Sequence, residues 1–132
     1  MIDRKGAPER GVIVVGAGED RRRFANKAVR AYLEAGYRVF PVHPTATACE
    51  GLPVAPSVSA LSESAELLLL YVRPEVGLAV VREAVARGVR RIYLNPGTES
   101  EELVREIERL GMEPIEACAI VALGRSPSEF AE

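Results

Sequence analysis

The chain has 132 residues, of which 48% are hydrophobic and 27% are charged, and its formal net charge is −2 at pH 7. This length predicts a single domain over residues 1–132, with a buried core but without room for a catalytic domain beside a nucleotide-binding unit. The small net charge provides no general attraction to nucleic acid. The most apolar run, residues 67–72, is too short to span a bilayer. We therefore expect neither a nucleic-acid nor a membrane partner.

The first ten residues are polar and charged and lack the apolar core of a secretion signal. We expect a loose lead-in at residues 1–10 and a cytoplasmic protein. The two cysteines, Cys49 and Cys118, are too few and too far apart to indicate a disulfide scaffold or a zinc site. Because His43 is the only histidine, no nucleophile–base set can be assembled around it. The sequence predicts no metal site and no catalytic residue.

The first strand, turn and helix organise the rest of the chain. Residues 12–15 (VIVV) are β-branched and uncharged, which predicts a strand buried on both faces. A glycine turn at residues 16–18 ends it. From Phe24 the apolar residues recur at intervals of three and four, which predicts a helix, and Gly36 stands where a left-handed glycine ends one. This change of period is typical of the opening of a parallel α/β nucleotide-binding domain.

Strands and helices alternate along the rest of the chain. Four further strands are predicted, at residues 37–42, 67–72, 91–94 and 112–116. Two further helices are predicted, from Pro74 to Gly88 and from about Ser100 to Gly111. Residues 43–64 look irregular, with a short helix that Ser57 caps, and residues 120–123 form an edge strand or a short helix. This alternation predicts an α/β fold, a Rossmann-like doubly wound parallel sheet of about five strands between two helical layers. With strands numbered along the chain, the expected order is 3-2-1-4-5.

The turns after the strands indicate the ligand, because ligands of such sheets bind at the carboxyl ends of the strands. A glycine turn that opens a helix lets backbone N–H groups approach a phosphate. The dinucleotide pattern GxGxxG is incomplete, since Arg21 stands where its third glycine belongs, and no acid follows strand two to hold a ribose. Three arginines at residues 21–23, with Lys27 behind them, favour a highly phosphorylated ligand over NAD.

Five stretches in chain order carry a family resemblance: VIVVGAG, FANKAVRAYLEAGYRVFPVHP, LLLYVRPE, IYLNPGTESEEL and EACAIVAL. Together they span residues 11–123 and resemble the small CoA-binding proteins of the YccU type. They are also similar to the CoA-binding Rossmann domain of succinyl-CoA synthetase α subunits. The resemblance implies coenzyme A or an acyl-CoA as the cofactor.

The resemblance also implies the binding residues, position by position. It assigns the diphosphate to the first turn and helix start, the adenosine to the end of strand two, and further contacts to the turns after strands three and four. These residues are Gly16, Ala17, Gly18, Asn26 and Lys27; Val42, His43 and Pro44; Arg73 and Pro74; and Asn95, Pro96 and Gly97. Five positions depart from the family: Gly18 replaces a common serine, His43 an asparagine, Ala55 an aromatic residue, Tyr93 a tryptophan and Asn95 a glutamine. The adenine and ribose contacts are therefore left open.

These observations favour a stand-alone binding module, and no enzyme, that acts as a carrier, a sensor or a store of CoA thiol. Arg23 is the preferred arginine for a phosphate, with a solvated loop as the alternative. Cys118 either faces the pantetheine arm or is buried and inert, whereas Cys49 is expected to be exposed and able to exchange with thiols. An NAD(P)-binding redox sensor or small oxidoreductase remains the alternative function. The sequence leaves open a homodimer and a partner enzyme.

Overall fold

The computed structural model describes residues 10–132, so the expected lead-in lies, apart from Arg10, outside the described residues. Five parallel strands form the central sheet. They are β1 (Gly11–Val15), β2 (Arg38–Val42), β5 (Leu67–Leu70), β6 (Arg91–Leu94) and β7 (Glu113–Ile115). Their order across the sheet is β2-β1-β5-β6-β7.

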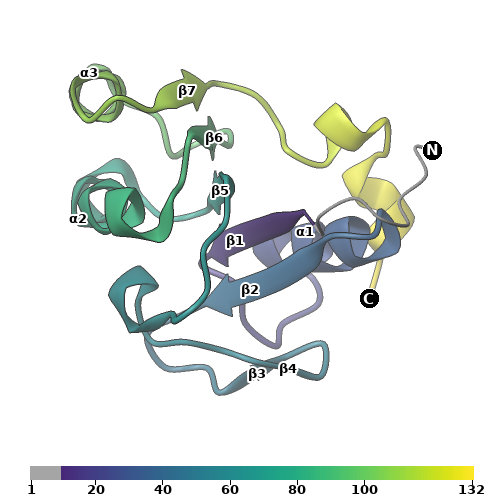
Figure 1. The fold of residues 1–132 in the computed structure, drawn as a ribbon. Coiled ribbons are helices and arrows are strands. Elements are labelled where there is room, and N and C mark those ends of the chain that lie inside the picture. The colour runs from purple at the N-terminus through teal and green to yellow at the C-terminus, as the bar shows by residue number, and fades with distance from the viewer. Residues whose placement is uncertain (1–9) are drawn as a thin grey trace.

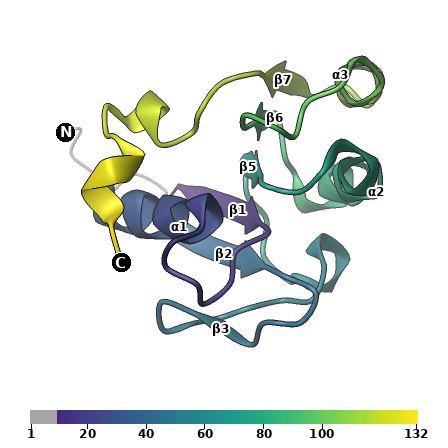
Figure 2. The same cartoon turned by 180° about the vertical axis from the view of Figure 1, so that it is seen from behind.

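Helical layers cover both faces of the sheet (Figures 1 and 2). One face carries α1 (Phe24–Glu34) and the 3₁₀ turns η3 (Val121–Leu123) and η4 (Pro127–Phe130). The other face carries α2 (Pro74–Ala84), which continues as η2 (Val85–Arg87), and α3 (Glu101–Arg109). This arrangement confirms the predicted α/β, Rossmann-like fold.

The predicted strand order is wrong at one place. The third predicted strand, β5, pairs with β1 through Val12 and Leu67 and does not pair with β2. Numbered along the chain, the observed order is therefore 2-1-3-4-5. Pro41 gives the physical reason, because its carbonyl faces away from β1 and accepts from the Ala55 amide at 3.1 Å. A proline has no N–H for a further strand, so β2 suits the edge of the sheet.

The opposite edge strand uses the same device. In β7, the Glu113 amide donates to the Arg90 carbonyl at 2.9 Å, so the next residue, Pro114, turns its nitrogen to the open side. Both edges thus lack one of the N–H groups that a foreign strand would pair with.

The irregular segment after β2 holds two short elements. An antiparallel pair, β3 (Ala48–Cys49) with β4 (Leu52–Pro53), was missed because two-residue strands leave no periodic pattern. The predicted short helix is the 3₁₀ turn η1 (Val58–Ala60), and its cap is the predicted one, since the Ser57 hydroxyl accepts from the Ala60 amide at 3.2 Å. The segment at residues 120–123 resolves as the 3₁₀ turn η3.

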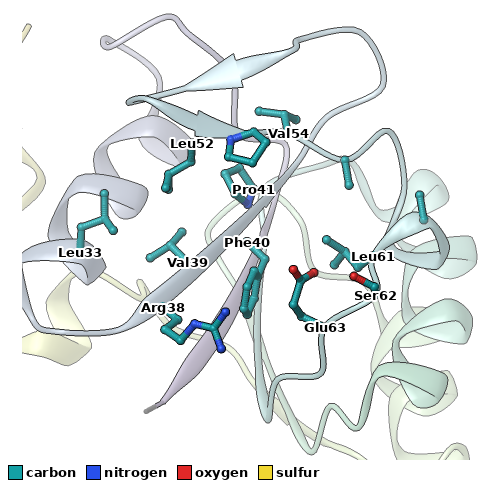
Figure 3. A pocket seen from close by; sticks show the side chains of 13 residues that line it. Leu33, Arg38, Val39, Phe40, Pro41, Leu52, Val54, Leu61, Ser62 and Glu63 are labelled. Carbon is teal, nitrogen blue, oxygen red and sulfur yellow. The ribbon is translucent and has the colours of Figure 1, made fainter.

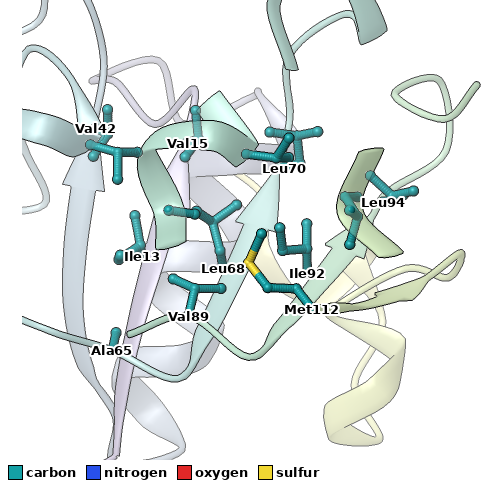
Figure 4. Packing of buried hydrophobic residues seen from close by; sticks show 14 of the residues in the cluster. Ile13, Val15, Val42, Ala65, Leu68, Leu70, Val89, Ile92, Leu94 and Met112 are labelled. Carbon is teal, nitrogen blue, oxygen red and sulfur yellow. The ribbon is translucent and has the colours of Figure 1, made fainter. Parts of the chain in front are cut away.

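The core lies on both sides of β1, as its unbroken apolar run predicts. Val12 and Val14 pack toward α1. Ile13 and Val15 pack toward α2 and α3, in the cluster of Figure 4 with Leu68 and other residues of β5, β6 and α2. Val12, Ile13 and Val14 are fully buried, and Val15 is nearly so. The strand that carries the glycine turn is therefore anchored by packing on both of its faces.

Candidate functional site

A cavity of about 530 Å³ opens at the carboxyl ends of β1, β2 and β5. Predicted site residues from three separate segments line it: Gly16 after β1, Val42, His43 and Pro44 at the end of β2, and Arg73 before α2. Tyr71, Ser57 and Val76 also contribute to its walls. The structure thus brings together the glycine turn, the end of β2 and the start of α2, which is where ligands of such sheets bind.

The glycine turn is required by the geometry of the backbone. Gly16 has a φ of +104°, and a Cβ placed on it would lie 3.0 Å from the carbonyl oxygen of Tyr71. The amides of Gly16 and Ala17 donate to the Val42 carbonyl at 2.8 and 3.2 Å. These two amides therefore fasten β1 to β2, so the turn's later N–H groups, from Gly18 onward, are the ones placed to meet a ligand.

Helix α1 begins without a side-chain cap and has no acidic residue in its first turn. Its first N–H groups, which have no partner inside the helix, and the positive end of its dipole therefore favour an anion nearby. By contrast, α3 is capped by the Ser100 hydroxyl, which accepts from the Leu103 amide at 3.1 Å, and carries two glutamates in its first turn.

Asn26, which the resemblance assigns to the diphosphate, is fully buried beneath the turn. Its amide nitrogen donates to the Gly18 carbonyl at 2.9 Å and to Glu50 at 3.2 Å. Its amide oxygen accepts from Nε of Arg30 at 2.9 Å. In this structure Asn26 holds the turn in shape from below.

Arg30 is a residue of this site that the sequence reasoning missed. Its guanidinium also donates to the carbonyls of Arg21 at 2.7 Å, Phe130 at 2.8 Å and Ala131 at 2.8 Å. It therefore joins the loop after β1 to the segment after η4. Its spacing of four residues from Asn26 on one helix face was the only available signal, because its other partners are distant in sequence.

The arginine run is largely neutralised by neighbouring carboxylates. Arg21 pairs with Glu50 at 3.1 Å and Arg22 with Asp20 at 3.0 Å. The hydrogen bond from Arg22 lowers the pKa of Asp20 below its ordinary value. Arg23 lies 3.9 Å from Asp20, and its side chain is 80% exposed. Among these three cations, Arg23 is therefore the most exposed and the most weakly paired.

Two more predicted cations lie near helix starts. Arg73, the residue before α2, has a side chain that is 79% exposed. Its Nε lies 3.9 Å from a carboxylate oxygen of Glu75, which is a long distance for an ion pair. Lys27 lies over the ring of Phe24, with Nζ 5.5 Å from the ring centroid. Pro74 occupies the first turn of α2, where its missing N–H costs nothing.

The predicted turn after β6 does not line the cavity. Asn95 is buried, with its amide nitrogen donating to the Leu70 carbonyl at 3.0 Å and its oxygen accepting from the Ala119 amide at 2.8 Å. Pro96 and Gly97 are exposed on the surface. Asn95 therefore ties the end of β5 to the segment that follows β7.

The expectation for Cys49 is wrong. Its side chain is fully buried in β3, under the Asn26 amide at 3.7 Å from Sγ, and burial raises the pKa of the thiol to about 11. Such a thiol is protonated and unreactive at neutral pH.

Cys118 is half-buried. Burial is the main cause that raises the pKa of Tyr71, and the nearby Cys118 adds to this rise. The buried hydroxyl of Tyr71 has no hydrogen-bond partner among the described residues.

Two other hollows contain none of the predicted site residues. One, of about 460 Å³, follows the open edge of β2 and is lined by side chains such as Phe40, Leu61 and Glu63 (Figure 3). The other, of about 620 Å³, lies at the amino ends of the strands, between Tyr37, Tyr93 and their neighbours.

Across residues 10–132, no group of three or more His, Cys, Asp or Glu side chains could hold a metal ion. No helix within that range is both long and apolar enough to cross a membrane.

The fold, the glycine turn and the cavity at the carboxyl ends of the strands define a Rossmann-like nucleotide-binding domain. A comparison with protein families matches the chain to the CoA binding domain over residues 10–124. The chain therefore belongs to this CoA-binding domain family, and the resemblance seen in the sequence is confirmed.

Solved structures share this fold over most of the chain. A conserved hypothetical protein from Pyrococcus furiosus is 33% identical, with a TM-score of 0.77 over 87% of this chain and 99% of its own. A protein from Thermus thermophilus is 26% identical, with a TM-score of 0.79 over 88% of this chain and 89% of its own. A dinucleotide-forming acetyl-coenzyme A synthetase from Ca. Korarchaeum cryptofilum, solved with phosphate and ADP, is 27% identical, with a TM-score of 0.71. That match covers 81% of this chain but 25% of the synthetase. No curated protein sequence matches the chain.

Proposed function

We propose that this protein binds coenzyme A or an acyl-CoA reversibly, as a binding module that does not turn over a substrate. The observation that carries the proposal is the cavity at the carboxyl ends of β1, β2 and β5, in which Gly16, His43 and Arg73 meet. Membership of the CoA-binding domain family supports the choice of ligand.

The parts of the ligand are assigned by charge and shape. The diphosphate lies over the glycine turn and the uncapped start of α1, where N–H groups and the helix dipole favour an anion. Arg23 and Arg73 are exposed and weakly paired, so each can turn toward a phosphate and form charge-assisted hydrogen bonds. Asn26 and Asn95 act from below, by fixing the Gly18 and Leu70 carbonyls.

Cys118 gives this proposal a finer form, in which the protein stores CoA as a mixed disulfide. Its thiolate would attack oxidised CoA, one CoA would remain bound through a new S–S bond, and the other would leave as the thiol. Incubation with oxidised CoA followed by intact mass measurement should show one CoA-sized adduct that a reductant removes. Cys118→Ser should abolish the adduct, whereas Cys49→Ser should retain it because that thiol is buried. An unmodified wild-type chain would refute storage without affecting reversible binding.

Thermal unfolding with a panel of nucleotides tests the proposed function. A ligand at a hundred times its dissociation constant adds about 2.7 kcal/mol to the free energy of unfolding. For a domain of this size, that free energy corresponds to a rise in Tm of roughly 10 °C. We expect this rise with CoA and a smaller one with dephospho-CoA, which lacks the 3′-phosphate. A rise only with NAD or NADP would instead make the chain a dinucleotide-binding protein.

A further inference from the structure

His43 is held in one orientation by the loop that follows it. The residue lies directly after β2 and is half-buried. Its Nδ1 accepts hydrogen bonds from the backbone amides of Thr45 at 3.1 Å and Ala46 at 3.0 Å. Backbone N–H groups can only donate, so Nδ1 must carry a lone pair. In the neutral ring the single proton therefore lies on Nε2.

The protonated edge of the ring faces the glycine turn. A Cβ placed on Gly18 would lie 3.4 Å from Cδ2 and 3.6 Å from Nε2 of His43. Among residues 10–132, no acceptor lies within hydrogen-bonding distance of Nε2. Gly18 itself leaves the space between the ring and the turn open, since any side chain there would contact the imidazole. The Nε2–H group is thus an unpaired donor at the mouth of the proposed site.

We infer that His43 is a fixed neutral donor that binds an oxygen of the ligand's diphosphate at the glycine turn, an inference that rests on the proposed function. Because Nδ1 is occupied by the loop, the ring can donate to the ligand but cannot accept from it. A phosphoryl oxygen satisfies this requirement, since it accepts without needing to donate. A ribose hydroxyl at the same place would find no acceptor on the ring. His43, which lies beside the glycine turn, therefore favours a phosphoryl oxygen of the diphosphate, in place of the adenosine contact that the resemblance implies for this position.

The single histidine allows a direct spectroscopic test. Long-range ¹H–¹⁵N correlation spectra of the imidazole contain the signals of one ring only, because the chain has one histidine. In the free protein we expect Nε2 to be protonated and Nδ1 unprotonated. Saturation with CoA should shift Nε2 and its proton while Nδ1 keeps its unprotonated signature. A proton on Nδ1, or ring signals that do not move in CoA-saturated protein, would overturn the inference.

A variant separates the donor from the loop anchor. In His43→Ser, the side-chain hydroxyl can still accept from a loop amide in an ST turn, but it is too short to replace the Nε2–H donor of the imidazole. We expect an unchanged Tm without ligand and about tenfold weaker binding of both CoA and dephospho-CoA, the size of one hydrogen bond to a charged group. The control Thr47→Ala, an exposed loop substitution, should bind both as the wild type does.

The outcomes distinguish the two proposals. Equal affinity of wild type and His43→Ser, with a normal CoA-induced rise in Tm, would overturn the role of His43 alone. A tenfold loss for CoA without any loss for dephospho-CoA would place the contact at the 3′-phosphate and contradict the assignment to the diphosphate. If CoA raises the Tm of neither protein, the proposed function and the role of His43 both fail.

Discussion

Replacing the buried Asn26 by alanine should destabilise the protein and loosen the glycine turn. The substitution removes the donor to the Gly18 carbonyl at 2.9 Å and the acceptor for Nε of Arg30 at 2.9 Å. A neutral hydrogen bond contributes about 0.5–1.5 kcal/mol and one to a charged group about 1.5–3 kcal/mol. Alanine is the better helix former by about 0.6 kcal/mol, which offsets part of this loss. The net expected cost is therefore about 1.5–4 kcal/mol.

Denaturant unfolding of Asn26→Ala beside the wild type measures this cost, and the expected loss corresponds to a fall in Tm of roughly 5–14 °C. Lys27→Ala is the matched control, since it changes the next residue of the same helix without removing a buried hydrogen bond, and it should stay within about 0.5 kcal/mol of the wild type. A stability of Asn26→Ala equal to that of the control would refute the view that Asn26 supports the turn.

Two further substitutions test the turn and the packing of the helices. Gly16→Ala forces a φ of +104° on a residue whose Cβ would lie 3.0 Å from the Tyr71 carbonyl oxygen. We therefore expect denaturant unfolding to show a loss of about 2–4 kcal/mol in the free energy of unfolding. The control Gly97→Ala, also at positive φ but with nothing within 4 Å of the added Cβ, should lose less stability. Hydrogen bonds from Arg109, with a second arginine from α2, lower the pKa of Glu106 to about 2 from an ordinary 4.5. A carboxyl whose pKa is lower in the folded than in the unfolded state stabilises the protein at pH values above its unfolded-state pKa. Glu106→Gln should therefore lower the Tm at pH 7, and the difference in Tm from the wild type should shrink as the pH falls from 4.5 toward 2. A difference in Tm that does not change with pH would contradict this ion pair.

Local features of the fold could be predicted because they depend on few neighbouring residues. Gly36 has the positive φ, +92°, that its place after the helix predicted. Ser57 caps the turn that it was expected to cap, and Ser100, at the expected start of the third helix, caps α3. The first strand and the start of α1 likewise follow from the residues at hand. The family resemblance then identified the domain family, which the comparison with protein families confirms.

Features that depend on long-range contacts could not be predicted in this way. To predict the strand order, one would have had to know that the nitrogen of Pro41 faces away from β1. The presence of a proline in this strand was nevertheless a usable signal that β2 lies at an edge of the sheet. The burial of Cys49 depends on β3 packing over Asn26, 23 residues away in sequence. Arg30 reaches Phe130, which is 100 residues away. In the candidate site, the sequence therefore named five residues that line the cavity and two that support it, Asn26 and Asn95, but it missed Arg30 and the wall residue Tyr71.

Titration of ¹⁵N-labelled protein with CoA, followed by amide chemical shifts, tests the central claim most directly, because it detects binding and locates it in one experiment. The account predicts saturable changes at the glycine turn, at His43 and at Arg73. Spectra that CoA leaves unchanged would contradict the account, and so would changes gathered at the β2 edge hollow of Figure 3 or at the amino ends of the strands.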